Sequence, residues 1–266
     1  MSERGCWVYG VTEREPGQEL GGLPGVSGEP VRAAPAGRLT VLVSDVDLGE
    51  FGQDALARNL EDLDWLEGVA RAHHHVIETV SRTLPVLPVG LTTVYSSEAG
   101  LASAFGERER EFTDGLALVR GRVEWGVKAY AQPRPDRPAR PERPRPRPQA
   151  GGERGAGIAY LKRRREQLAD QRESRRDEAE AAREVHAALA GHAARWRLHP
   201  PQSPRLSGTD TPMLLNAAYL LDQGAEAGFR EVVADAAGAH PELRLELTGP
   251  WPPYSFAGEA REEGVT

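Results

Sequence analysis

Three consecutive histidines, His73, His74 and His75, are the first residues to consider for chemistry, because imidazole binds metals and transfers protons near neutral pH. They lie in a segment whose apolar residues recur at helical spacing, and neighbouring residues on a helix point about 100° apart. Three adjacent histidines therefore cannot converge on one metal ion, and no other histidine or cysteine is close in sequence. We expect His73 to be a packed, hydrogen-bonded core residue and His75 to face solvent.

Glu124 and Lys128 form a second candidate pair, because they fall on the same side of a predicted strand, residues 122–130. In an enzyme of unknown type they could flank a substrate. The simpler interpretation is the polar face of a half-buried strand with a surface or partner-binding role, and exposure of both side chains would remove the enzyme hypothesis. The sequence contains no GxSxG elbow, P-loop, GxGxxG motif after a strand or HExxH motif. We therefore expect no catalytic residue, no metal and no cofactor.

The bulk composition excludes several classes of protein. One cysteine, Cys6, rules out an internal disulfide, and its place in a predicted strand indicates a small buried apolar group. No apolar run is long enough to span a bilayer, and the first ten residues lack the layout of a signal peptide. The net charge of −7 does not favour a nucleic-acid partner. These features predict a cytoplasmic protein that binds neither membrane nor nucleic acid.

Basic residues concentrate in two places. Residues 132–150 contain seven prolines and six arginines, a composition that excludes helix and predicts an extended tether. The run KRRREQ at 162–167 follows, and it supplies Arg163 and Arg164 as candidate partner-binding residues. Neither stretch has interleaved aromatic residues, so nucleic-acid binding remains the weaker interpretation.

The segment GPWPPYSF at 249–256 combines three prolines with Trp251, Tyr254 and Phe256. Its prolines predict an extended path, and its aromatic rings can bury large apolar areas. Two interpretations stay open, a rigid strap that closes over the second core and an exposed aromatic-proline docking surface. The candidate partner-binding residues are Trp65, Glu124, Lys128, Arg163, Arg164, Trp251, Tyr254 and Phe256.

The elements that would position these residues fall into two bodies, an N-terminal α+β domain at 1–131 and a C-terminal domain at 156–266, joined by a linker at 132–155. In the first body, alternating and apolar runs predict strands at 6–11, 39–44, 86–94 and 122–130, with helices at 54–83 and 97–118. In the second, a long charged helix at 156–197 precedes a strand at 213–221, a helix at 225–239 and a strand at 243–248. The order of elements in the first body predicts a sandwich of helices on a mostly antiparallel sheet. The order of elements in the second body resembles a ferredoxin-like arrangement.

The long helix carries an imperfect heptad pattern, because Arg165, Arg172 and Arg175 fall on its apolar seam. We expect it to pack at its two ends and to be solvated, or met by an acidic surface, in its middle. The run at 213–221 could by itself equally be helical.

Seven segments in order give the chain a resemblance to the gas vesicle protein GvpF/GvpL family. They are VYGV at 8–11, DLDWLEGVARAHHHVIE at 62–78, LPVLPVGLTTVY at 84–95, GRVEWGVKAY at 121–130, GIAYLKRRRE at 157–166, LLNAAYLLD at 214–222 and TGPWPPYSFA at 248–257. The chain departs from the family in its proline-arginine tether and in having His74 and His75 beside the usual histidine, His73.

The resemblance implies a non-enzymatic role in building gas vesicles, with binding of the major shell protein and of other accessory proteins, or a place as a minor vesicle component. It also implies two domains, a modified α/β sandwich and a ferredoxin-like domain with a long, coiled-coil-like helix. The alternative function is a general coiled-coil adaptor unrelated to vesicles, which would dimerise through the helix at 156–197.

Overall fold

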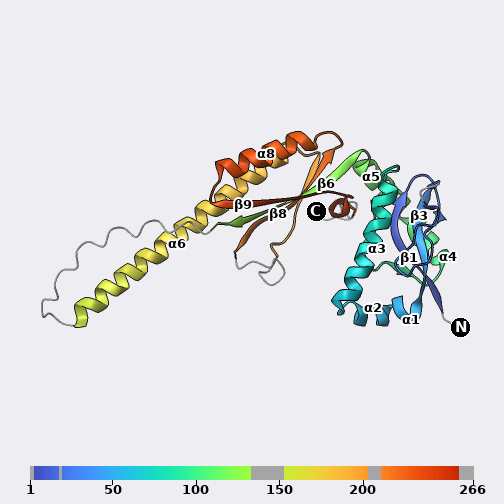
Figure 1. The fold of residues 1–266 in the computed structure, drawn as a ribbon, viewed down its shortest axis with the longest axis horizontal. Helices are drawn as coiled ribbons and strands as arrows, with labels where there is room; N and C mark the ends of the chain where they lie inside the picture. Colours follow the sequence, from blue (N-terminus) through green and yellow to red (C-terminus); the bar gives the residue numbers. More distant parts are fainter. Residues whose placement is uncertain (1–2, 18–19, 133–152, 203–210, 258–266) are drawn as a thin grey trace. The chain divides into compact units, whose positions relative to one another are not determined.

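The computed structural model describes residues 3–17, 20–132, 153–202 and 211–257, with the side chains of 153–160 and of 163 left out (Figure 1). Its contacts divide the chain into two compact units. The first comprises Met1–Trp125, Leu220–Gln223 and Gly249–Thr266, and the second comprises Gly126–Tyr219 and Gly224–Thr248. Most of the predicted linker, residues 133–152, lies outside the described residues.

The sheet of the first unit is antiparallel and is built around its first strand. Its path runs β2 (Arg32–Ala36), β3 (Leu39–Asp47), β1 (Arg4–Thr12) and β4 (Leu87–Pro88), and β5 (Val94–Tyr95) also pairs with β1. The predicted strands at 6–11 and 39–44 are confirmed, and the expected bent strand at 86–94 is β4 and β5 with a loop between them. We did not predict β2, because its sequence RAAPA has a proline and no β-branched residue.

Five helices accompany this sheet: α1 (Leu48–Phe51), α2 (Gln53–Asn59), α3 (Leu63–Ser81), α4 (Glu98–Glu107) and α5 (Glu109–Val119). The single helix predicted at 54–83 is wrong in one respect, since the chain breaks between α2 and α3. The Asp62 carboxylate accepts hydrogen bonds from the backbone N–H groups of Asp64 and Trp65 and so begins a new helix. The helix predicted at 97–118 is likewise two helices, α4 and α5, which meet at Arg108.

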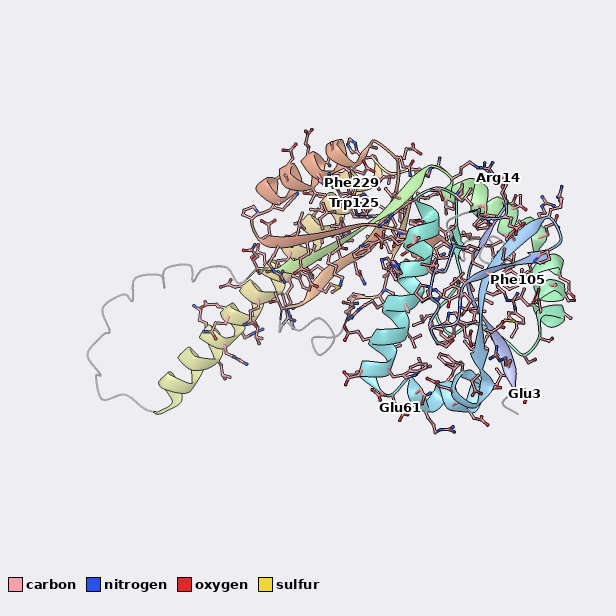
Figure 2. The ribbon with its side chains drawn as sticks, turned by 45° about the vertical axis from the view of Figure 1, so that its right-hand side comes forward. Glu3, Arg14, Glu61, Phe105, Trp125 and Phe229 are labelled. Atoms are coloured by element: carbon pink, nitrogen blue, oxygen red, sulfur yellow. The ribbon has the colours of Figure 1, made fainter. Side chains whose placement is uncertain are left out.

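The core of the first unit lies between α3 and the sheet, where side chains of α3 point toward β1 (Figure 2). Trp7 of β1 is fully buried and packs edge-on against Phe51, with ring centroids 5.7 Å apart. Val76, Ile77 and Val80 of α3 belong to the same cluster. The later part of the predicted apolar stripe, with Ile77 and Val80, therefore faces the sheet, but Leu60 and Leu63, which the same spacing placed on that stripe, are exposed.

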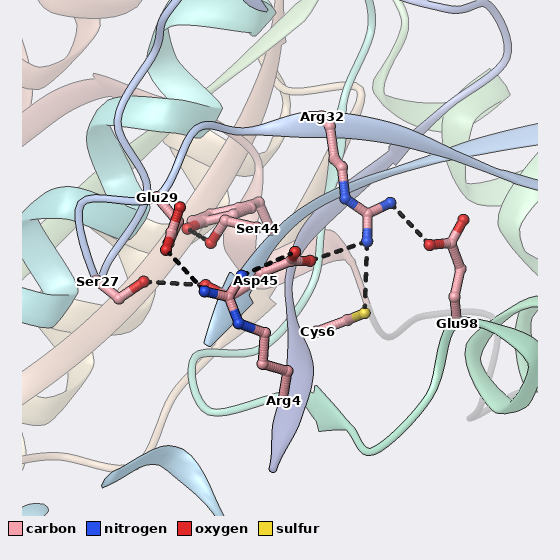
Figure 3. A network of polar contacts seen from close by, with 9 residues as sticks. Arg4, Cys6, Ser27, Glu29, Arg32, Ser44, Asp45 and Glu98 are labelled. Carbon is pink, nitrogen blue, oxygen red and sulfur yellow. Dashed lines mark hydrogen bonds and ion pairs between the residues drawn. The ribbon is translucent and has the colours of Figure 1, made fainter. Parts of the chain in front are cut away.

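A polar network ties β1, β2 and β3 to α4 (Figure 3). The Arg32 guanidinium lies 3.0 Å from a carboxylate oxygen of Asp45 and 2.9 Å from one of Glu98. It also points a nitrogen at Cys6 Sγ, 3.8 Å away. Burial raises the pKa of the Cys6 thiol although Arg32 opposes this. The predicted burial of Cys6 is confirmed, but its sulfur contacts a guanidinium and does not act only as a small apolar group.

The sheet of the second unit has the order β7 (Arg195–Leu198), β8 (Met213–Asp222), β6 (Arg122–Ala131) and β9 (Leu243–Trp251). Among its described residues this unit has two helices that pack on each other, α6 (Glu153–Ala190) and α8 (Glu226–Ala239). The element order β6, α6, β7, β8, α8, β9 is the β-α-β-β-α-β order of ferredoxin-like folds. This confirms the ferredoxin-like prediction, with β6, which was expected in the first body, and β7, which was not predicted, as the two further strands.

Two expectations about this unit are wrong. The strand predicted at 122–130, which is β6, was expected to complete the first body, but it lies between β8 and β9 in the second sheet. Residues on both faces of β6 are buried. The helix expected to reach residue 197 ends at Ala190, ahead of Gly191, and residues 195–198 form β7. The strand at 213–221 and the helix at 225–239 are confirmed as β8 and α8.

Helix α6 is packed at one end only in its described part. Its buried residues all lie in the last ten, namely Ala181, Ala182, Val185 and Leu189. From Leu161 to Arg176 every described side chain except the half-buried Ser174 is exposed, as expected for the middle of this helix. In the described ranges, no helix is both long enough and apolar enough to cross a bilayer.

Candidate protein-binding surface

The segment 249–256 belongs to the first unit, where it forms the end of β9 and a 3-10 turn, η2 (Tyr254–Phe256). Phe256 is fully buried and anchors its end. Trp251 and Tyr254 are the two large apolar residues of the segment that remain exposed. The segment is thus a strap, as one interpretation predicted, but it is a strap of the first unit and not of the second. It also displays two aromatic rings, as the other interpretation predicted.

Glu124 fixes the path of the strap. One carboxylate oxygen accepts a hydrogen bond of 2.8 Å from the backbone N–H of Ser255, and the other accepts one of 2.6 Å from the Ser255 hydroxyl. Glu124 is only 8% exposed, so the expectation of a surface position for this residue is wrong. A buried carboxylate whose oxygens are held by two short hydrogen bonds serves to position the chain and not to bind a partner directly.

Gly249 lets the strap approach β6 closely. Its φ of +122° lies in a region that side chains rarely adopt. A Cβ atom at this position would lie 2.9 Å from the backbone oxygen of Glu124 and 3.3 Å from the Trp125 ring. The glycine is therefore required both by its backbone conformation and by the space available.

His74 of α3 completes the exposed surface. Its Nδ1 lies 2.9 Å from the hydroxyl of Tyr254, and its ring centroid lies 5.6 Å from that of Trp251, edge to face. The Tyr254 side chain is 37% exposed, and the burial of the rest of it, with the nearby carboxylates of Glu124 and Glu78, raises its pKa, so its hydroxyl stays protonated and available for this hydrogen bond. We call His74, Trp251 and Tyr254 the aromatic patch. No role was predicted for His74, because its hydrogen-bond partner Tyr254 lies 180 positions away in the chain.

The other predicted residues do not join the aromatic patch. Lys128 belongs to the second unit, where its Nζ donates a hydrogen bond of 3.1 Å to Gln202 Oε1, so Glu124 and Lys128 form no common site within either unit. Trp65 is half-buried, packs on Phe51, and donates from Nε1 to Glu50 Oε1 at 3.1 Å. Arg164 is exposed on α6, and the side chain of Arg163 lies outside the described part.

His73 is a core residue, as predicted. Trp7 Nε1–H donates a hydrogen bond of 3.0 Å to His73 Nδ1, so the proton of the neutral ring is on Nε2, which is buried and makes no hydrogen bond of normal geometry. Burial lowers the pKa of His73 to about 4, and the nearby backbone of Val89 opposes the shift only in part. His75 is exposed, also as predicted. In the part of the chain that the structure describes, no three His, Cys, Asp or Glu side chains are grouped to hold a metal ion.

Comparisons with known proteins give a consistent result. The family model described as gas vesicle synthesis protein GvpL/GvpF matches residues 5–258. Gas vesicle protein L of Streptomyces sp. (strain CB03234) is 38% identical over 263 residues, which are 98% of this chain and 96% of that protein. Gas vesicle protein F of the same strain is 25% identical over 257 residues, 94% of this chain and 98% of that protein.

Two crystal structures share the fold across nearly the whole chain. The gas vesicle protein GvpF from Anabaena sp. PCC7120 has a TM-score of 0.63 and 19% identity, and the match covers 96% of each chain. The gas vesicle protein GvpF from Microcystis aeruginosa has a TM-score of 0.62 and 19% identity, with 95% of this chain and 98% of that one covered.

Proposed function

Because the chain belongs to the gas vesicle synthesis protein GvpL/GvpF family, we propose that it is a non-enzymatic assembly protein that binds the major gas vesicle shell protein and other accessory proteins. The observation that carries this proposal is the family match over residues 5–258, which runs through both units. The match supports a role connected with gas vesicles. The step from that role to shell-protein binding, in the cytoplasm and at the vesicle, is our proposal.

The aromatic patch is the surface we propose for binding. Aromatic side chains dominate the energetics of protein interfaces, because they bury large areas while losing little conformational entropy. The strap that carries Trp251 and Tyr254 is held in place by Glu124 and Phe256, so little ordering remains to oppose binding. A shell protein with much apolar surface would be a suitable partner, since such surfaces associate without direction unless they are covered before assembly.

The function is tested with the full chain and purified shell protein. The shell protein is diluted out of denaturant with and without an equimolar amount of the chain, and the fraction left in the supernatant after centrifugation is measured. We expect the chain to keep more shell protein in solution and to be recovered bound to it. Equal recovery with and without the chain, together with no co-purification, would refute shell-protein binding.

The surface is tested by Trp251→Ala, with Trp196→Ala as the matched control. The two tryptophans have similar exposed fractions, 43% and 46%, but Trp196 is on β7 in the second unit. We expect Trp251→Ala to weaken shell binding by about tenfold or more and Trp196→Ala to leave it unchanged. If both variants bind like the wild type, the aromatic patch is not the binding surface even if the chain binds shell protein.

A further inference from the structure

Two leucines stand out for their exposure. Leu63 is 76% exposed and Leu161 is 61% exposed, the highest fractions of any large apolar residue that the structure describes. Single exposed leucines are normal on protein surfaces, so exposure alone indicates nothing. What distinguishes these two is that each has a second exposed leucine nearby and that their surroundings carry opposite charge.

Leu63 is at the centre of an acidic surface in the first unit. It begins α3, and Leu60, also exposed, ends α2 just before it. Residues 48–67 contain six acidic residues and one basic residue, and Glu61 lies at the exposed end of α3 (Figure 2). We call Leu60, Leu63 and the exposed acids Glu61, Asp64 and Glu67 the acidic leucine patch; of these, Glu67 also forms an exposed ion pair with Arg71.

The turn that carries the acidic leucine patch is held by hydrogen bonds and by packing on the core. Asp62 caps α3 through hydrogen bonds of 3.0 and 3.2 Å, which fixes the turn that carries both leucines. Behind that turn, Trp65 packs on the buried Phe51 with ring centroids 5.6 Å apart. The leucines are therefore held on the surface by ordered structure, and the core beneath is already filled by other side chains.

Leu161 is on the exposed half of α6 in the second unit. Residues 161–176, which we call the basic arm, contain seven basic and three acidic residues, a net charge of +4 against −5 for residues 48–67. Leu168 is seven positions after Leu161, so the two leucines lie on one face of the helix about 10 Å apart. A half-helix whose side chains are almost all exposed gains nothing from packing within its own unit.

We propose that the basic arm of one copy binds the acidic leucine patch of a second copy. The two surfaces are complementary in chemistry, since each offers a pair of exposed leucines in a stretch with a net charge, and the two net charges have opposite signs. Every chain carries both surfaces in equal number, so a second copy is always available as the partner. The contact joins different surfaces of the two copies, so it builds head-to-tail chains unless two copies exchange their arms reciprocally in a closed dimer. This inference does not depend on binding of shell protein.

Sedimentation velocity of the full chain over a range of concentrations tests the association. At about 50 mM salt we expect the mean mass to rise with protein concentration, and at about 500 mM salt to fall toward that of the monomer, because exposed charges are then screened. A wild-type chain that stays monomeric at every concentration in low salt would overturn the proposal.

Two double variants test the surfaces. The patch variant is Leu63→Lys with Glu67→Lys, and the arm variant is Arg164→Glu with Arg165→Glu. We expect each alone to be monomeric and folded, as judged by circular dichroism. An equimolar mixture should form dimers and nothing larger, because the intact arm of the patch variant binds the intact patch of the arm variant. The control Arg164→Lys with Arg165→Lys keeps the charge and should associate like the wild type.

The mixture of the patch variant and the arm variant discriminates best between the possible arrangements. A two-fold contact between identical surfaces would not be restored by mixing, so a mixture that stays monomeric overturns the head-to-tail arrangement. A folded arm variant that associates like the wild type overturns the role of the basic arm, and the same result for the patch variant overturns the role of the acidic leucine patch.

Discussion

His73 makes the core of the first unit sensitive to acid. The side chain is 3% exposed, and burial lowers its pKa from 6.5 to about 4. In the unfolded chain the same ring takes up a proton near pH 6.5, whereas the folded chain does so only near pH 4. Between these values the unfolded state binds more protons, so acid favours unfolding. The stability associated with neutral His73 is fully present above pH 6.5 and is lost as the pH falls toward 4.

The size of the effect follows from the shift. A pKa difference of about 2.5 units corresponds to about 3 kcal/mol between the two protonation states. Solvent screening reduces this free-energy difference only slightly, since the ring is almost completely enclosed. The hydrogen bond from Trp7 Nε1–H to His73 Nδ1 acts in the same direction, because only the neutral ring can accept it.

Hydrogen exchange measured by mass spectrometry on the intact chain resolves this effect within one unit. The free energy of opening is obtained for peptides from α3 between pH 4 and pH 7, after correction for intrinsic exchange rates. In wild type it should fall by about 3 kcal/mol more over this range than in His73→Gln, whose side chain does not titrate. The exposed neighbour provides the control, and His75→Gln should retain the wild-type pH dependence.

One result would refute His73 as the cause of the acid sensitivity. If α3 in His73→Gln loses as much stability between pH 7 and pH 4 as in wild type, the acid sensitivity comes from other groups. The buried imidazole would then be protonated without cost, and the enclosure of its Nε2 would not persist in solution.

Two further predictions concern the strap. Glu124→Gln can keep both contacts with Ser255, with its oxygen accepting from the backbone N–H and its NH2 group donating to the hydroxyl, but it removes the negative charge that strengthens them. The opening free energy measured by hydrogen exchange in strap peptides should therefore fall by about 1–2 kcal/mol. Gly249→Ala should destabilise the first unit by about 2 kcal/mol in thermal or chemical unfolding, because the added Cβ meets backbone at 2.9 Å and φ is positive. Gly228→Ala in α8 is the control, since nothing lies within 4 Å of its Cβ and helix propensity favours alanine by about 1 kcal/mol. Equal stability of the two alanine variants would contradict the argument for Gly249.

Local patterns predicted those features that depend on one segment and its burial. The three-four spacing around His73 correctly placed this residue in the core and His75 in solvent. The alternation in 243–248 identified β9, whereas the apolar run in 213–221, which is β8, was also compatible with a helix. Where a helical or alternating period is present, the residue types indicate which face is buried without knowledge of the partner of that face.

Features that depend on distant partners were missed. The strand β6 has the same local pattern whether it completes the first sheet or begins the second, and only its pairing with β8 and β9 decides between them. Glu124 was expected on a polar face because nothing near it in sequence reveals Ser255, 131 positions later. The aromatic patch was foreseen only in part for the same reason, since Trp251 and Tyr254 were identified but His74 was not.

The position of β6 also changes the interpretation of the proline-arginine segment at residues 132–150. The sequence suggested a tether between two bodies, yet the segment leads from the end of β6 to the start of α6, at Glu153. The end of β6 and the described part of α6 both belong to the second unit. Cutting the chain within this segment would therefore remove β6 from its place between β8 and β9 and would leave neither half with a complete set of strands. The chain instead passes from the first unit to the second within β6, between Trp125 and Gly126, so functions must be assigned to units by surface substitutions in the intact protein.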